Sequence, residues 1–343
     1  MKESKIKKKN TFLKKVFLKL SRRLGYEVMD QSDLTLQDSD GGNSKSSLSK
    51  LGVNSLTLPM GMVTITRPVK SLDIILRTCA SVKMLTQSKE RIFEKKKSEY
   101  TLRCLKSIVN SIKFSEDELK KIKIKLTIID FNSDQEIIDK FETILNNNFF
   151  SYEIKKLEYE KYSAQISDTN EENKPVTVNQ KSNMSNIHQS IELSKSSDDL
   201  IYFVEDDYIH SKNSILELIS AYEKFTSQLN TEIFLCPTDY PYLYRDIEHT
   251  NILIGNQSHW RRINQTLCTF LTSKKMIDKY HEKITQMCKF EHYPFEKPLH
   301  EIYKKEFCFS PIPSVAIHCT NINSIYGLSP NVDIRKLWEE AAF

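Results

Sequence analysis

The sequence predicts an α/β fold of three layers, in which helices cover both faces of a mostly parallel central sheet. From about residue 70 onward, short apolar runs alternate with amphipathic segments of helical spacing, and this alternation is typical of strand–helix units. In addition, the apolar run 200–204 leads directly into Glu205, Asp206 and Asp207. Ligands of such sheets bind at the carboxyl ends of strands, where these three acids lie.

The first half of the body follows the alternation closely. Ser133 or Asp134 is a suitable N-cap for the second helix. The polar stretch 160–182 is predicted to be a loop. Strands are expected at 72–78, 125–131, 152–159 and 200–205, and helices at 99–112, 133–147, 183–195 and 214–229.

The second half is less regular. The stretch 238–265 is aromatic and polar with little hydrophobic periodicity. Strands are expected at 232–237 and 266–273, a helix at 274–288, and an extended segment at 307–320.

Three segments differ in composition. Residues 1–29 are predicted to form a basic amphipathic helix, residues 30–58 a flexible linker, and residues 59–343 the folded body. Apolar residues recur at helical spacing within 7–24, and Lys and Arg fill the other face. Such a helix suits an anionic membrane surface, or it docks on its own domain.

Charge is unevenly distributed along the chain. Residues 1–23 hold ten Lys or Arg and one Glu, whereas the rest holds 40 basic and 44 acidic residues. The net charge of +5 therefore comes from the N-terminal arm. A mildly acidic body argues against a nucleic-acid partner.

Cysteine and glycine usage excludes several classes of site. Seven cysteines without a CxxC pair indicate reduced thiols rather than disulfides or zinc. With no long apolar run and no signal peptide, we expect a cytoplasmic protein that can lie peripherally on the inner membrane face. No glycine occurs between residues 62 and 254, which excludes a P-loop and a GxGxxG site.

The three carboxylates at 205–207 indicate a divalent cation. Because strand side chains alternate, Glu205 and Asp207 face one way and Asp206 the other. Oxygen ligands of this kind suit Mn²⁺ or Mg²⁺, which keep positions open for phosphate oxygens. The alternative is a solvated acidic turn at the start of a helix.

Several segments, in order, resemble the GT-A-fold glycosyltransferases, which use nucleotide-sugars. "IYFVEDD" resembles their DxD metal motif in an EDD variant, and the whole is similar to family 2 of these enzymes. "LDIILRTCA" resembles their first strand, "LTIIDFNSD" their second, and "IPSVAIHCT" the late strand that delivers a histidine. The likeness covers about 70–320, with a nucleotide-sugar half at 70–230 and an acceptor half at 231–320.

This resemblance implies a role for each matching residue. It implies Asp207 and His318 as metal ligands. Glu replaces the first Asp of the common motif, and "IIDFNSD" lacks its second Asp and its Gly. The implied contacts to nucleoside, ribose or metal-bound water are Arg77, Thr78, Asp130, Glu205 and Asp206.

An inverting enzyme of this kind needs a carboxylate base. Glu291, Glu296 and Glu301 are the candidates, and Glu296 is favoured because the neighbouring prolines and Phe295 would bury it and raise its pKa.

Aromatic and basic residues offer a place for an acceptor. Trp260 can stack on a sugar or lie in the core, and Arg261 and Arg262 can pair with phosphate. Candidate lining residues of an acceptor site are Tyr240, Tyr242 and Tyr244.

The resemblance implies a metal-dependent transferase (hexosyltransferase-like, EC 2.4) of polysaccharide biosynthesis. It would move a sugar from a nucleotide-diphosphate-sugar, with a UDP-sugar favoured, to a glycan or lipid-linked acceptor. Alternatives are a nucleotidyltransferase, which normally carries a Gly-rich signature that is absent here, and a non-catalytic binding or scaffold protein.

Overall fold

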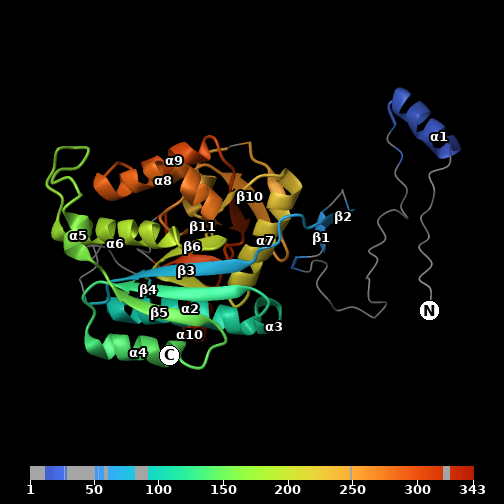
Figure 1. The fold of residues 1–343 in the computed structure, drawn as a ribbon. Coiled ribbons are helices and arrows are strands. Elements are labelled where there is room, and N and C mark those ends of the chain that lie inside the picture. Colours follow the sequence, from blue (N-terminus) through green and yellow to red (C-terminus); the bar gives the residue numbers. More distant parts are fainter. Residues whose placement is uncertain are drawn as a thin grey trace. The chain divides into compact units, whose positions relative to one another are not determined.

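The computed structural model describes residues 12–26, 28, 51, 52, 54–57, 61–81, 92–247, 249–319 and 325–343. It divides the chain into two compact units, Met1–Ser46 and Ser47–Phe343, shown in Figure 1. All seven cysteines lie in the described part, and none of them forms a disulfide. Among the described residues, no helix combines the length and apolarity needed to cross a membrane.

The first unit contains helix α1, Phe12–Arg23. It lies within the predicted helix 1–29 and is shorter, and residues 1–11, 27 and 29 fall outside the described part. Gly25 ends the helix with φ of +86°, the left-handed conformation that glycine adopts readily. Most apolar side chains of α1 are exposed, including Phe12 at 80% and Phe17 at 57%, whereas Leu18 is partly buried.

The second unit is built on a nine-stranded sheet with the order β5-β4-β3-β6-β11-β8-β12-β10-β9. The first four strands in this order are parallel to one another. Beyond β6, most pairs are antiparallel, and β8 and β12 pair in parallel. The strands are β3 (Ser71–Thr78), β4 (Lys123–Asp130), β5 (Ser151–Lys156), β6 (Leu200–Glu205), β8 (Phe234–Leu235), β9 (Ile252–Ile254), β10 (His259–Ile263), β11 (Phe270–Ser273) and β12 (Cys308–Ile312).

Helices cover both faces of this sheet, which confirms the predicted α/β class (Figure 1). Successive residues of β3 enter different apolar clusters, since Ile74 packs with one helix layer and Ile75 with the other. This separation of side chains by strand alternation gives each helix layer its own apolar core. One layer contains α2 (Lys97–Phe114), α4 (Gln135–Leu145) and α7 (Ser214–Leu229). The opposite layer contains α6 (Val178–Ser194), α8 (Lys274–Lys289) and α9 (Lys297–Tyr303).

The polar stretch 160–182 differs from the predicted loop. It contains helix α5, Tyr159–Ser163, and the first turn of α6, which begins at Val178 rather than at 183. Thr177 and Gln180 form a capping box at this start, a pattern that the sequence carries and that marks a helix N-terminus. The neighbouring strand β5 is correspondingly shorter than predicted and ends at Lys156.

The second half contains elements that were not predicted, because its hydrophobic periodicity is weak. Strands β9 and β10 and the 3₁₀ turn η2 (Pro241–Tyr244) lie in the stretch without a predicted element. Strands β8 and β11 are shorter than expected, and the extended segment is divided into β12 and β13 (Ala316–His318). The other elements are β1 (Asn54–Thr57), β2 (Gly61–Thr64), β7 (Tyr208–His210), α3 (Glu116–Leu119) and α10 (Ile334–Glu340).

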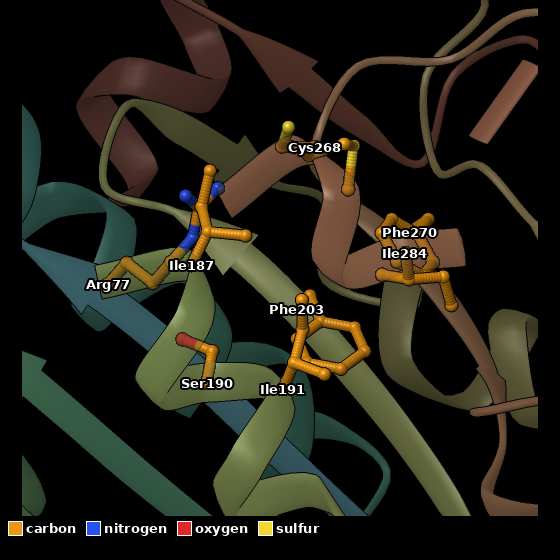
Figure 2. Close-up of a pocket in the computed structure, with 9 residues that line it drawn as sticks. Arg77, Ile187, Ser190, Ile191, Phe203, Cys268, Phe270 and Ile284 are labelled. Atoms are coloured by element: carbon orange, nitrogen blue, oxygen red, sulfur yellow. The ribbon is translucent and has the colours of Figure 1, made fainter. Parts of the chain in front are cut away.

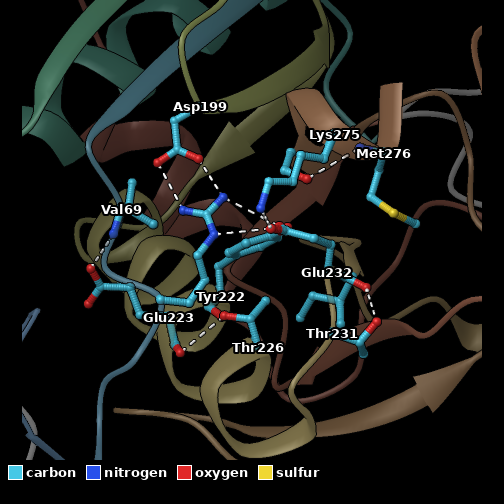
Figure 3. Close-up of polar contacts among 12 residues, drawn as sticks. Val69, Asp199, Tyr222, Glu223, Thr226, Thr231, Glu232, Lys275 and Met276 are labelled. Atoms are coloured by element: carbon cyan, nitrogen blue, oxygen red, sulfur yellow. Dashed lines mark hydrogen bonds and ion pairs between the residues drawn. The ribbon is translucent and has the colours of Figure 1, made fainter. Parts of the chain in front are cut away.

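Strand β1 falls inside the segment 30–58 that composition assigns to the linker, and it pairs with β2 as an antiparallel hairpin. Just after this hairpin, Arg67 is bound by two acidic side chains, Asp199 and Glu232, both labelled in Figure 3. Its Nη2 lies 2.5 Å from Asp199 Oδ1 and its Nε lies 3.2 Å from Glu232 Oε1. Asp199 immediately precedes β6, so this ionic cluster braces the edge of the sheet opposite to the carboxyl ends of the parallel strands.

Gly255 shows why a glycine is needed in the turn between β9 and β10. A Cβ atom there would lie 2.3 Å from Glu217 Oε1 and 2.5 Å from Trp260 Nε1. We therefore expect Gly255→Ala to lower the free energy of unfolding by about 1–3 kcal/mol, because overpacking forces buried groups apart. Urea unfolding measures this effect. Gln257→Ala, in the same turn, should change stability little, and equal losses in both variants would contradict the steric explanation.

Candidate active site

The end of β6 is brought against the late histidine by a small two-stranded ladder. Strand β7 pairs with β13, and Tyr208 is the register partner of His318. The Cys319 amide donates to the Asp207 carbonyl at 2.8 Å. As a result, Asp207 Oδ2 lies 3.2 Å from His318 Nε2. The structure therefore unites two residues that are 111 positions apart in the chain.

The His318 ring is held on two further sides. Its Nδ1 lies 3.2 Å from the Tyr326 carbonyl oxygen, and its plane stacks on Tyr208 with ring centroids 4.7 Å apart. Burial acts to lower the pKa of His318, but the Asp207 carboxylate outweighs it, and the pKa is raised. The geometry fixes the ring so that Nε2 faces Asp207.

Glu205, the last residue of β6, pairs with Arg77 of the neighbouring strand β3. The Arg77 Nη2 lies 3.3 Å from Glu205 Oε1, and Thr269 Oγ1 donates to Glu205 Oε2 at 3.3 Å. Arg77 is buried and also donates to Asn183 at 3.3 Å. The Arg77 guanidinium thus compensates the charge of a carboxylate at the end of the neighbouring strand.

Asp206 lies in the turn after β6, and its side chain has other partners than Glu205, namely α2 and the segment after β3. Its Oδ2 accepts from Thr101 Oγ1 at 2.9 Å and from the Cys79 amide at 3.2 Å. The ammonium of Lys97 lies 3.5 Å from the same oxygen. Buried and bound by these groups, Asp206 anchors the start of α2 rather than joining Glu205 and Asp207.

Thr78 and Asp130 lie side by side at the ends of β3 and β4, where they are register partners. Thr78 Oγ1 donates to Asp130 Oδ1 at 2.7 Å. Ser133 donates its amide to Asp130 Oδ2 at 2.9 Å. Both side chains are buried, so Thr78 and Asp130 form a buried, hydrogen-bonded pair at this edge of the sheet.

Glu296 is the candidate base that approaches the carboxylates at the end of β6. It is half-buried at the N-cap of α9, and Cys268 Sγ lies 3.7 Å from its Oε1. Burial, followed by the nearby Glu205 carboxylate, raises the pKa of Glu296 to about 7. This agrees with the predicted direction, because both causes oppose the charged form.

The other two candidate bases are engaged elsewhere. Glu291 accepts hydrogen bonds from Asn170 and Gln180. Glu301 is partly buried and pairs with Lys283. Neither of these contacts involves a residue of the β6 carboxylate site, so Glu296 is the candidate that the structure places next to Glu205.

The segment 160–182 supports the chain around Glu296. Phe295 packs on a small apolar cluster of Ile166, Val176 and Met184. The Glu171 amide donates to the Glu291 carbonyl at 3.1 Å. Sequence reasoning missed this support, because the contacts join polar segments more than 100 residues apart for which no periodic signal exists.

A small, mostly apolar pocket lies between the sheet and helices α6 and α8 (Figure 2). Arg77 and Cys268 contribute to its wall, and each also lies beside one of the two acids Glu205 and Glu296. The remaining lining residues are Ile187, Ser190, Ile191, Phe203, Phe270, Ile284 and Met287.

Trp260, Arg261 and Arg262, which the sequence offers as substrate contacts, are each bound by other side chains of the protein. Trp260 is fully buried, and its Nε1 donates to Glu217 at 3.0 Å, so the core alternative holds rather than sugar stacking. The Arg262 guanidinium lies over the Phe307 ring, 4.7 Å from its centroid. Arg261 Nη2 lies 2.5 Å from Asp239 Oδ1. This ion pair engages the guanidinium group that was predicted to pair with phosphate.

Asp207 and His318 are suitable ligands for a divalent cation. Within the described ranges, no group of three or more His, Cys, Asp or Glu side chains could hold a metal ion. Two protein ligands nevertheless suit Mn²⁺ or Mg²⁺, since such ions are bound by one or two side chains together with substrate phosphates and water. The donor set therefore fits an ion that binds together with a diphosphate.

The sequence matches no protein-family model and no curated protein. Among solved structures, it is similar to S. aureus TarS, with TM-score 0.37 and 13% identity over 70% of this chain and 57% of that one. It is also similar to the galactosyltransferase LgtC in complex with donor and acceptor sugar analogues, with TM-score 0.37 and 9% identity over 78% of this chain and 95% of that one. A third is UDP-glucose pyrophosphorylase complexed with UDP-glucose, with TM-score 0.36 and 6% identity over 80% and 97% of the two chains.

The match thus spans less than two thirds of the TarS chain. At these TM-scores the likeness is too remote to assign a family or an activity to this chain.

Proposed function

We propose that this chain is a metal-dependent glycosyltransferase that moves a sugar from a nucleotide-diphosphate-sugar, with a UDP-sugar favoured, to a glycan or lipid-linked acceptor. The observation that carries the proposal is the convergence of Asp207, His318 and Glu296 at the end of β6. The Asp207–His318 pair, which we propose as the metal ligands, lies there beside a carboxyl group whose pKa is about 7. A general base is most effective when its pKa lies near the working pH.

The donor would lie along the carboxyl ends of the parallel strands. Asp207 and His318 would hold Mn²⁺ or Mg²⁺, which neutralises charge on the diphosphate leaving group when bound. The Thr78–Asp130 pair would position the nucleoside. Arg77 would keep Glu205 in place, and Glu205 would contact ribose or metal-bound water.

Glu296 would act on the acceptor. In an inverting reaction its carboxylate takes the proton of the attacking hydroxyl while the bond from the sugar to the diphosphate breaks. The position of Glu296 next to Glu205 suits this role, because the acceptor must reach the donor sugar from outside the strand ends. A retaining reaction would not need such a base.

Turnover of a nucleotide-sugar panel with Mn²⁺ tests the proposal. We expect release of free nucleoside diphosphate from one donor, slow with water and faster with an acceptor sugar, and lost on chelation of the metal. Formation of pyrophosphate from a nucleoside triphosphate and a sugar phosphate would instead indicate a nucleotidyltransferase. No turnover of any donor, together with intact folding, would favour a binding or scaffold protein.

Helix α1 supports a proposal about location. Its exposed apolar face and the ten basic residues of 1–23 match an anionic membrane surface, where apolar burial and charge attraction add together. This would place the enzyme peripherally on the inner face of the cytoplasmic membrane, near lipid-linked acceptors.

Substitution of the exposed phenylalanines tests membrane binding. We expect the full chain carrying Phe12→Ser and Phe17→Ser to sediment with phosphatidylglycerol-containing vesicles several-fold less than wild type, because two apolar side chains no longer contribute burial in the membrane surface. Phe114→Ser is a matched control, since Phe114 is 61% exposed on α2. Equal vesicle binding by the double variant and the wild type would contradict the proposal.

A further inference from the structure

A continuous set of aromatic rings leads away from the Asp207–His318 pair. The His318 ring stacks on Tyr208, whose hydroxyl lies 2.6 Å from the Tyr240 hydroxyl. Tyr240 stacks on Tyr242 with centroids 5.5 Å apart, and Tyr242 contacts Tyr326 at 5.2 Å. The set therefore begins at the candidate metal site and ends at Tyr326.

The inner rings are rigid and the last ring is accessible. Tyr208 and Tyr240 are fully buried, whereas Tyr326 is 41% exposed. Two backbone contacts fix the accessible end, because the Tyr242 amide donates to the Ile325 carbonyl at 3.3 Å and the Tyr326 carbonyl lies 3.2 Å from His318 Nδ1. A large aromatic side chain is thus partly open to solvent although its backbone is anchored.

The open end of the set adjoins the candidate base. Tyr242 and Phe295, the residue before Glu296, pack on the same apolar cluster. The pKa of Tyr242 is raised, mainly by burial, and the charges of Cys236 and then Glu296 contribute. A molecule lying on Tyr242 and Tyr326 would therefore lie close to the His318 ring, which the Tyr326 carbonyl contacts, and within electrostatic range of Glu296.

We propose that the exposed Tyr326 ring, with the Tyr242 ring tilted against it at 56°, forms the platform on which the acceptor binds, and that the acceptor group at this point is a neutral pyranose ring. This inference rests on the proposed function and specifies its acceptor. The faces of aromatic rings carry negative charge and attract the weakly positive C–H groups of one sugar face. The sugar hydroxyls at the ring edge remain free, so one of them can face Glu296.

The chemistry of the surroundings favours this occupant. An anionic group on the platform would lie near the carboxylates of Glu205 and Glu296, whose mutual influence already raises the pKa of Glu296, and like charges repel. An alkyl chain on the platform would not hold the acceptor hydroxyl group in a fixed position, and Glu296 must deprotonate that hydroxyl group. A neutral sugar satisfies both requirements.

Binding of simple sugars to the full-length protein tests the platform without donor or metal. We propose saturation-transfer NMR with a panel of methyl β-glycosides of glucose, galactose and N-acetylglucosamine. We expect transfer from aromatic protein protons to the C–H groups on one face of at least one sugar. Tyr326→Ala should weaken this binding by up to about tenfold, and Tyr326→Phe, which keeps the ring, should restore it.

Tyr152→Ala is the matched control, because Tyr152 is 38% exposed on strand β5 and lies outside the aromatic set. Retained binding in this variant, with loss only in Tyr326→Ala, supports the platform. The absence of binding by every sugar, or equal binding by wild type and Tyr326→Ala, overturns it. Donor turnover is measured separately, so sugar binding without any donor turnover would reject the transferase reaction but keep the platform.

Discussion

Asp207→Asn is expected to lower transfer by at least about 100-fold while leaving the fold intact. The substitution keeps the shape of the side chain but removes the negative charge that would bind the cation, and even indirect partners of metal sites change activity by about 10–100-fold. Asp207 is only partly buried, so the amide should be tolerated. Steady-state rates over a range of Mn²⁺ concentrations measure the effect, and thermal unfolding reports on the fold.

Two other aspartates provide controls for this variant. Asp198→Asn removes an exposed ion pair with Lys123 at the opposite end of β6 and should leave transfer unchanged. Asp206→Asn should lower the melting temperature, because Asp206 is buried and bound by Thr101 and the Cys79 amide. Activity of Asp207→Asn close to wild type, with an unchanged requirement for Mn²⁺, would contradict the metal site.

Glu296→Gln is expected to lower the rate of transfer by about 10²–10⁴-fold, the usual contribution of a general base. In the wild type, the rate should rise with pH and level off above about 7, because the pKa of Glu296 is about 7 and only the carboxylate can accept a proton. The variant should lose this dependence. Glu301→Gln is the matched control, because Glu301 is a partly buried residue of α9 paired with Lys283, and it should retain both the rate and the pH profile.

The raised pKa of Glu296 also predicts that the free energy of unfolding falls over the pH range in which the rate of transfer rises. A folded-state pKa raised above the unfolded value means that the folded protein holds this proton more tightly. The contribution of Glu296 to stability is therefore present at low pH and is lost as pH rises from about 4.5 to about 7. Urea unfolding should show that Glu296→Gln lacks this decline.

The outcome that would contradict the role of Glu296 as the base concerns the rate of transfer. If the wild type and Glu296→Gln shared one pH–rate profile, Glu296 would not be the base.

Strong local patterns made the central part of the site predictable. The apolar strand β6 and the acids that follow it could be read directly, and the predicted separation of Asp206 from Glu205 agrees with their different partners. The resemblance named both Thr78 and Asp130, and they are register partners at the ends of β3 and β4. In each case the relevant residues lie at or just beyond the ends of neighbouring parallel strands.

The remaining features depend on contacts that no local pattern encodes. Tyr326 joins the site through rings contributed by four separate chain segments. The polar stretch 160–182 has a structure because it is bound to the chain around Glu291, and its most useful local signal was the capping box of Thr177 and Gln180. Trp260 could not be assigned to the core from sequence, because its partner Glu217 lies 43 residues away.

Binding of UDP to the protein, measured by isothermal titration calorimetry with and without Mn²⁺, tests the central claim most directly. A site that holds a diphosphate through a cation on Asp207 and His318 predicts binding that requires Mn²⁺, is lost in Asp207→Asn, and persists in Glu296→Gln, whose carboxyl group acts on the acceptor instead. UDP binding that is equally tight without metal, or that survives Asp207→Asn unchanged, would contradict the assignment of this edge of the sheet as a metal-dependent nucleotide-sugar site.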